Sequence, residues 1–229
     1  SAMAPKRSLP SGVLRPEKPQ GFLVVPDFVS ASEEEALIQE LRHGKRHWLD
    51  KAHLKFSNTR QQEYGPQISD AMELVEAEPR SPPAKTAALA QKVAREAQRL
   101  GLVASGLGQS GFCRVNLYKS GGYMHKHMDS KKCFGPVIAC CSLLSDATMT
   151  FYDTGGSAYG LAKVHDIATV AIPRRSLYFM TGPSRSQWQH GIKKDHCPKE
   201  RLSLTFRSVR PDAPRAVCGK GLKKRPAAK

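Results

Sequence analysis

The sequence predicts an α+β protein, mostly β, in which an antiparallel sandwich or barrel packs beside two outer helices. After residue 110, short runs rich in β-branched and aromatic residues follow one another, separated by Gly, Pro, Ser and Asp. No helical period interrupts them, which argues against parallel βαβ units. The predicted strands cover residues 112–118, 137–144, 147–152, 166–172, 176–180 and 201–208.

The segment before this β-rich region begins with an arm, a strand and a helix. Residues 1–20 hold four prolines and little apolar content, so we expect a mobile basic arm. The apolar run 22–25 then predicts a strand that Pro26 ends. Two overlapping capping boxes, Ser30 with Glu33 and Ser32 with Glu35, predict a helix that ends at Gly44. The arm therefore leads into an ordered strand and helix.

A second helix is predicted after a segment without a clear period. Residues 45–80 show neither a helical nor a strand pattern. Ser81-Pro82-Pro83 then provides a helix start, and Gly101 provides its end. Its apolar face consists of Leu89, Val93, Ala97 and Leu100. We accordingly divide the chain into the arm (1–20), an N-terminal extension with helices (21–110), a β core (111–212) and a basic tail (213–229).

The charge balance predicts a polyanionic partner. The chain of 229 residues has 36 Lys and Arg against 20 Asp and Glu, a net charge of +16, and the body between the basic ends still carries +7. Such a surplus favours salt-sensitive binding of nucleic acid. A solvated basic surface without a partner is the alternative interpretation. We expect a monomer that does not bind membranes, because no apolar run approaches the ~18 residues of a membrane helix.

Cysteines and the tail bear on where the protein resides. The six cysteines form no CxxC pair and no regular framework, which indicates reduced thiols in an intracellular protein. The stretch Lys223-Lys224-Arg225 resembles a nuclear import signal, although short basic clusters are common. We therefore expect a nuclear and/or cytoplasmic location.

Three residues form a candidate metal site. His127 and Asp129 stand two apart, so on a strand their side chains point to the same face. His190, near the end of the β-rich region, supplies a third ligand. Two histidines and one carboxylate with open positions describe the facial triad of non-haem Fe(II) oxygenases. Other histidines compete as ligands, namely His125, His165 and His196.

A second constellation predicts an anion site. In the run 201–207, alternation places Arg201, Ser203, Thr205 and Arg207 on one face and apolar residues on the other. Two arginines inside an apolar barrel are costly unless anions meet them, and a dicarboxylate supplies two. Asn116 and Tyr118 add inward hydrogen-bonding groups from an earlier strand. The alternative is an outward, solvated face on an edge strand.

Together these motifs resemble the AlkB family of Fe(II)/2-oxoglutarate dioxygenases. The resemblance runs from about residue 21 to 210 and includes the segment Pro173–Gly182, Arg185 and Trp188-x-His190-Gly-Ile192, which is similar to eukaryotic AlkB homologues. It implies a double-stranded β-helix (jelly roll) core. It also implies Fe(II) held by His127, Asp129 and His190, with 2-oxoglutarate and O2 as co-substrates and ascorbate as reductant in vitro.

The resemblance assigns roles to the other motif residues. Arg201 would pair with the distal carboxylate of 2-oxoglutarate, and Arg207 would contact the carboxylate nearer the metal, assisted by Asn116 and Tyr118. Ser203 stands where some members have Asn, which leaves its contact open. Residues 45–80 would form a nucleotide-recognition lid, in which Arg60 meets a phosphate and Tyr64 stacks on a base. For Tyr64 the alternative is ordinary packing at a turn.

The function implied is oxidative removal of N-methyl groups from bases of RNA or single-stranded DNA, with release of formaldehyde, succinate and CO2. Two alternatives keep the same oxygenase chemistry: hydroxylation of tRNA and demethylation of a protein methyl-lysine. A third is a catalytically silent, nucleic-acid-binding β-barrel. A structural zinc site using Cys133, Cys197 or His196 fits no zinc template.

Overall fold

The computed structural model describes residues 10–44, 48–50, 57–102, 107, 111–158 and 162–216. The first half of the arm and the proposed import signal lie outside these residues. Within the described ranges, no helix is long and apolar enough to cross a membrane.

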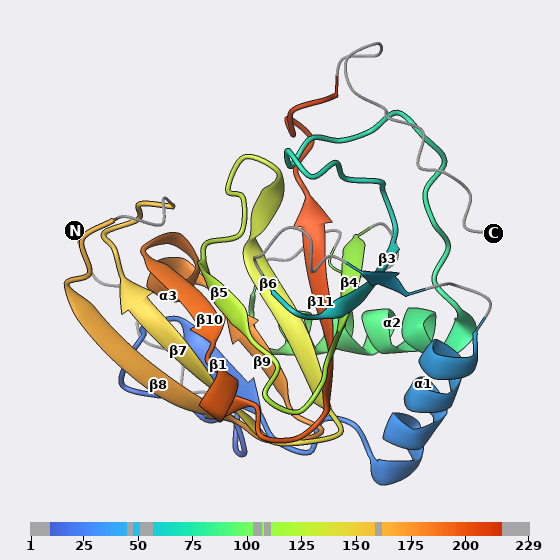
Figure 1. Ribbon diagram of the computed structural model, residues 1–229, viewed down its shortest axis with the longest axis horizontal. Helices are drawn as coiled ribbons and strands as arrows, with labels where there is room; N and C mark the ends of the chain where they lie inside the picture. Colours follow the sequence, from blue (N-terminus) through green and yellow to red (C-terminus); the bar gives the residue numbers. More distant parts are fainter. Residues whose placement is uncertain are drawn as a thin grey trace.

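Two antiparallel sheets face each other (Figure 1). The major sheet has the strand order β1-β9-β6-β11-β4-β3-β2, and the minor sheet has the order β5-β10-β7-β8. The major-sheet strands are β1 (Phe22–Val25), β2 (Leu49–Asp50), β3 (Arg60–Tyr64), β4 (Phe112–Tyr118), β6 (Phe134–Leu143), β9 (Leu177–Met180) and β11 (Arg201–Val209). The minor-sheet strands are β5 (Met124–His127), β7 (Ala147–Asp153), β8 (Asp166–Ile172) and β10 (Trp188–Ile192).

The helices cover the outer face of the major sheet (Figure 1). They are α1 (Ala31–His43) and α2 (Ala84–Arg99), and short helices follow at α3 (Gly182–Ser186) and Lys194–His196. Buried residues of α1 and α2 share one apolar cluster with Leu202, Leu204 and Phe206 of β11. A second cluster fills the space between the sheets and includes Phe151 and Trp188. The fold is thus a jelly roll with helices on one side, as the sequence predicts.

The strand β11 is central rather than at an edge. It pairs with β4 on one side and with β6 on the other, and Arg201 lies opposite Tyr118. Because both faces of β11 are buried, its alternating side chains enter two different buried regions, one under the helices and one between the sheets. The leucines and Phe206 pack under the helices, and the polar residues from Arg201 to Arg207 point between the sheets. The alternative of a solvated edge strand is therefore wrong.

The predicted elements match closely where the local pattern is strong. The predicted strand over 22–25 and the two helices are confirmed, with the Ser30–Glu33 capping box formed at α1. From residue 10 onward, the predicted mobile arm makes contacts with the two sheets. Leu14 exchanges two backbone hydrogen bonds with Val24, at 2.8 and 2.9 Å, so the arm covers the open edge of β1. Lys18 also forms an ion pair with Asp166 of the minor sheet.

Glu40 joins the two helices and provides the first prediction. Its carboxylate accepts hydrogen bonds from the backbone of Lys85 (2.7 Å) and from the backbone and hydroxyl of Thr86 (2.8 and 3.0 Å). Pro83, the N-cap of α2, makes no side-chain cap bond. Glu40→Ala is expected to lower the free energy of unfolding by about 1–3 kcal/mol, because the donors at the start of α2 lose their acceptor.

Urea denaturation of the purified variant tests this expectation. Glu35→Ala is the matched control, since Glu35 is exposed on α1 and bonds only to Gln39 in its own helix. Equal stability of the two variants would show that Glu40 does not cap α2.

Candidate metal centre and anion cavity

The three predicted metal ligands converge at one end of the minor sheet. His127 ends β5 and pairs directly with His190 of β10. Asp129 follows two residues after His127, and one ligand atom from each residue lies within 4.8 Å of the others. Among the described residues this is the only such group of metal-binding side chains. The competing histidines and the zinc alternative with Cys133, Cys197 or His196 therefore form no cluster there.

The orientation of Asp129 depends on two arginines from elsewhere in the chain. Asp129 lies beyond the end of β5, so strand alternation does not position it. Arg207 donates to its Oδ1 from Nη2 at 2.8 Å and from Nε at 3.1 Å. Arg185 donates from Nη1 to the Asp129 carbonyl at 2.8 Å and holds the carbonyl of Ser130 as well. These contacts leave Oδ2 directed at His190, 3.9 Å from its Nε2.

The charge states of the three ligands suit a cation. Burial by itself would raise the pKa of the Asp129 carboxyl, but Arg207 and the two histidines lower it well below its usual range. Burial lowers the pKa of His190 to about 3 and lowers that of His127 too, despite the nearby Asp129 carboxylate. The His127 Nδ1 lies 3.0 Å from the His125 carbonyl oxygen, and an Nδ1–H donated to this oxygen places the lone pair of the neutral ring on Nε2. At neutral pH the site offers two neutral imidazoles and one carboxylate.

The triad opens into a cavity of about 670 Å³ between the sheets. Both arginines of β11 line it, and Arg201 is only 1% exposed. The Arg201 Nε donates to Ser142 Oγ at 2.9 Å, and its guanidinium carbon lies 5.1 Å from the centre of the Tyr118 ring. No carboxylate pairs with Arg201 in the described part of the chain. The cavity thus holds a buried cation without a counter-ion.

Four buried polar atoms that line this cavity have no hydrogen-bond partner among the described residues. They are Asn116 Oδ1, Asp129 Oδ2, Arg201 Nη2 and Arg207 Nη1. Leaving such atoms unsatisfied costs free energy, which indicates that a ligand completes them. A divalent cation suits Asp129 Oδ2 beside the histidines, and a dicarboxylate suits the two guanidinium groups. The residues therefore fit Fe(II) and 2-oxoglutarate.

The remaining predicted residues for 2-oxoglutarate also reach the cavity. Asn116, Tyr118 and Ser203 all line it, and each is nearly buried. Burial raises the pKa of the Tyr118 phenol to about 12, although Arg201 opposes this rise, so the phenol remains a hydrogen-bond donor at neutral pH. The structure brings together all eight residues predicted to hold the metal or 2-oxoglutarate.

The two predicted substrate residues have different positions. Arg60 begins β3, is exposed, and lies with its guanidinium carbon 5.9 Å from the centre of the Trp48 ring. Tyr64 is 3% exposed, packs in the cluster under the helices, and donates its hydroxyl to Gln62. Neither residue lines the cavity. The prediction that Tyr64 stacks on a base is corrected to packing, because its neighbours cover the ring.

Several residues that complete the cavity escaped the sequence prediction. Arg185 carried part of the family resemblance but had no predicted role; it is buried in the structure and donates to the Asp129 carbonyl. Tyr178 of β9 lines the cavity, and so do Gln61, Asp70 and Met72 of the predicted lid. Polar lid residues carry no periodic pattern, so only their tertiary position identifies them.

Protonation of the triad gives a prediction for stability. The folded-state pKa of His190 lies below that of an unfolded histidine, so the unfolded chain binds more protons between about pH 3 and 6.5. Stability is thus fully present above this window and is lost as the pH falls through it. Between pH 7.5 and 5.5 we expect the metal-free protein to lose about 1.4 kcal/mol through this imidazole.

Urea denaturation at both pH values measures the loss, and His190→Gln is the control. This variant lacks the titrating imidazole, so the difference between the two pH values should shrink. The same pH dependence in both proteins would contradict the assignment.

Comparison with known proteins shows to which family this chain belongs. The family model of the 2OG-Fe(II) oxygenase superfamily matches residues 21–207. The chain is 27% identical over 180 residues to tRNA (carboxymethyluridine(34)-5-O)-methyltransferase alkbh8 of Xenopus tropicalis, covering 79% of this chain and 26% of that protein. It is 23% identical over 217 residues to human alpha-ketoglutarate-dependent dioxygenase alkB homolog 4, covering 82% of this chain and 67% of that protein. The solved structure of OsALKBH1 shares the fold, with a TM-score of 0.55, 18% identity, and coverage of 85% of this chain and 98% of that one.

Proposed function

Because this chain belongs to the 2OG-Fe(II) oxygenase superfamily and is of the AlkB type, we propose that it oxidatively removes N-methyl groups from nucleic-acid bases. The observation that carries the oxygenase chemistry is the set of four unsatisfied polar atoms around one cavity. The observation that favours a nucleic-acid substrate is the net charge of +16.

The residues would hold two groups side by side. His127, Asp129 and His190 would hold Fe(II), and Arg201, Asn116, Tyr118, Ser203 and Arg207 would hold 2-oxoglutarate. When bound, Fe(II), 2-oxoglutarate and O2 supply an oxidation that yields succinate and CO2 and hydroxylates the methyl carbon, after which formaldehyde leaves the base nitrogen.

The protein itself would orient the bound groups inside the cavity. Arg207 neutralises the Asp129 carboxylate through one oxygen and leaves the other oxygen for the metal. Arg201 has charge and hydrogen-bonding capacity left over for a carboxylate, and its bond to Ser142 fixes the direction of the guanidinium plane. Met72 and Ala71 of the predicted lid add apolar groups to the lining of the cavity, near which the methyl group would be held.

RNA is favoured over DNA as the substrate by one comparison. The alkbh8 relative is named for an activity on tRNA, and the region of likeness covers most of this chain. The chain spans about a quarter of that relative, so the relative's whole activity is not transferred. Hydroxylation of an RNA base without loss of formaldehyde is the second candidate function. A nuclear and/or cytoplasmic location stays a prediction.

Product analysis tests the proposal. The chain is incubated with Fe(II), 2-oxoglutarate and ascorbate, together with methylated single-stranded RNA and DNA oligonucleotides and methyl-lysine peptides. Formaldehyde and succinate from an oligonucleotide would support demethylation and identify the base. Succinate without formaldehyde would support hydroxylation, formaldehyde from a peptide would indicate a protein substrate, and neither product from the metal-loaded protein would favour the silent barrel.

A further inference from the structure

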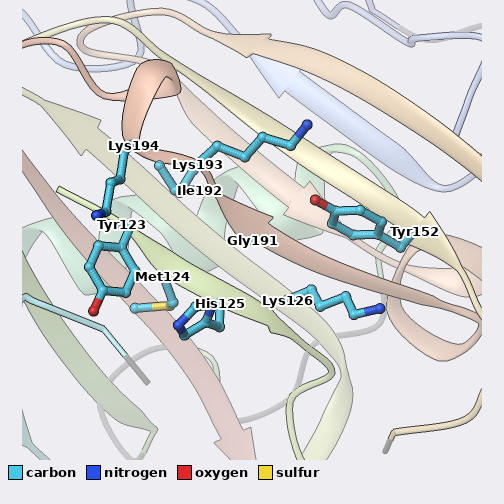
Figure 2. Close-up of a pocket in the computed structure, with 9 residues that line it drawn as sticks. All are labelled: Tyr123, Met124, His125, Lys126, Tyr152, Gly191, Ile192, Lys193 and Lys194. Atoms are coloured by element: carbon cyan, nitrogen blue, oxygen red, sulfur yellow. The ribbon is translucent and has the colours of Figure 1, made fainter. Parts of the chain in front are cut away.

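A second concave site lies on the outer face of the minor sheet. This outer groove has a volume of about 640 Å³, and Figure 2 shows its side chains over β5, β10 and β7. Its lining residues are Tyr123, Met124, His125, Lys126, Tyr152, Gly191, Ile192, Lys193 and Lys194. The proposed oxygenase chemistry uses none of its polar side chains.

The outer groove is cationic and has no acidic lining residue. It has three lysines, and no ion pair involves them in the described part of the chain. Lys193 and Lys194 are exposed, and Lys126 is partly exposed. Three ammonium groups around one concave surface repel one another. An anion that binds there is attracted by all three and relieves this repulsion.

Aromatic rings stand beside the lysines. The Lys126 Nζ lies 5.4 Å from the centre of the Tyr152 ring, and the Lys194 Nζ lies 5.4 Å from that of Tyr123. The rings of Tyr123 and His125 meet edge to face at 5.1 Å. Figure 2 shows Tyr123 and His125 on one side of Gly191 and Tyr152 on the other. Flat rings and ammonium groups in alternation match the bases and phosphates of a single strand.

Gly191 allows the backbones of β10 and β5 to approach closely at the base of the outer groove. A Cβ at this position would lie 2.8 Å from the Met124 carbonyl oxygen and 3.0 Å from the Lys126 nitrogen. The register between β5 and β10 shifts at this point, between His190 and Ile192. A side chain on Gly191 would therefore collide with the backbone of β5 and force this edge of the groove to shift.

The outer groove adjoins the catalytic cavity. Met124, Gly191 and Ile192 line both, and Gly191 directly follows the ligand His190. The Tyr123 nitrogen donates to Asn58 Oδ1 at 2.8 Å, which connects the edge of the groove to the predicted lid. Its neighbour Ser57 lines the catalytic cavity. A single-stranded nucleic acid bound in the outer groove would thus lie next to the catalytic cavity.

We infer that the outer groove binds the single-stranded RNA that flanks the target base, with Lys126, Lys193 and Lys194 on phosphates and Tyr123 and Tyr152 stacked on bases. RNA rather than DNA suits the imidazole of His125, which can hydrogen-bond a ribose 2′-hydroxyl. This inference rests on the proposed function for the identity of the strand, but binding is measured without turnover.

The test is fluorescence anisotropy with the full metal-free chain and a labelled single-stranded RNA of about ten nucleotides, within the usual site size. Lys126→Ala/Lys193→Ala/Lys194→Ala is expected to weaken binding at least about tenfold and to reduce the slope of log affinity against log salt by about 2. The matched control, Lys85→Ala/Arg95→Ala/Arg99→Ala, removes the same charge from α2 on the opposite layer and should change both values much less.

Aromatic variants test stacking separately. Tyr123→Ala and Tyr152→Ala are each expected to weaken binding by roughly tenfold with an unchanged salt slope, whereas the Phe variants should bind as wild type. Circular dichroism confirms that each variant is folded before its affinity is measured.

Three results would overturn the inference: equal losses in the groove and α2 triple variants, displacement of RNA by a polyglutamate peptide as efficiently as by unlabelled RNA, or tighter binding of the matching DNA. The two proposals fail separately. RNA bound in the groove without any formaldehyde release would refute only demethylation, and normal demethylation with unaffected groove variants would refute only the groove.

Discussion

Asp129→Asn is expected to lower turnover and metal affinity by at least about a hundredfold while the protein stays folded. Loss of a residue that merely orients a ligand typically costs 10- to 100-fold, and Asp129 is the only anionic ligand of the triad. The amide keeps an oxygen for the two Arg207 bonds, at 2.8 and 3.1 Å, so the arginine retains its partner. Metal affinity is measured by Mn(II) titration and turnover by succinate release.

Asp129→Ala separates the two roles of the carboxylate. It should lose the same activity but also unfold more easily, because Arg207 is left buried and unpaired. Asp212→Asn is the control, since that carboxylate pairs with Arg210 on the surface and lies outside the cavity. Wild-type Mn(II) affinity in Asp129→Asn would refute the metal assignment.

Arg201→Lys is expected to raise the KM for 2-oxoglutarate by about 10- to 100-fold with a smaller change in kcat. Lysine keeps the charge but cannot form the two parallel hydrogen bonds of a guanidinium to a carboxylate. It also loses the bond to Ser142 and the flat contact with Tyr118 that orient the group. The loss of one or two charge-assisted bonds, each about 1.5–3 kcal/mol, accounts for the range.

Steady-state kinetics at varied 2-oxoglutarate measures this effect, and equilibrium dialysis with the Mn(II)-loaded protein supports it. Arg175→Lys is the control, because its partly exposed guanidinium pairs with Asp27 far from the cavity. A change in kcat alone would mean that Arg201 does not bind the co-substrate.

Much of the fold follows from local patterns in the sequence. The capping box at Ser30, the apolar face of α2 and the alternation in β11 each specify an element and its buried face. The alternation in β11 also places Arg201 and Arg207 on one face, opposite the apolar residues, whereas the pairing of β11 on both sides decides that this face points inward. The polar strand β3 was not predicted, since Arg-Gln-Gln-Glu-Tyr has no strand pattern and pairs only because β4 lies beside it.

The working geometry of the site depends on contacts between distant segments. The sequence by itself determined which residues form the triad and the anion site, because their types and their order along the chain carry that information. The tertiary structure alone decided that Arg185 and Arg207 orient Asp129, that Tyr64 is buried, and that lysines and tyrosines in or next to β5, β7 and β10 share a groove. The physical reason is that tertiary packing joins separate segments, 56 residues apart for Arg185 and Asp129 and 78 residues apart for Arg207 and Asp129, and no local period records which segments become neighbours.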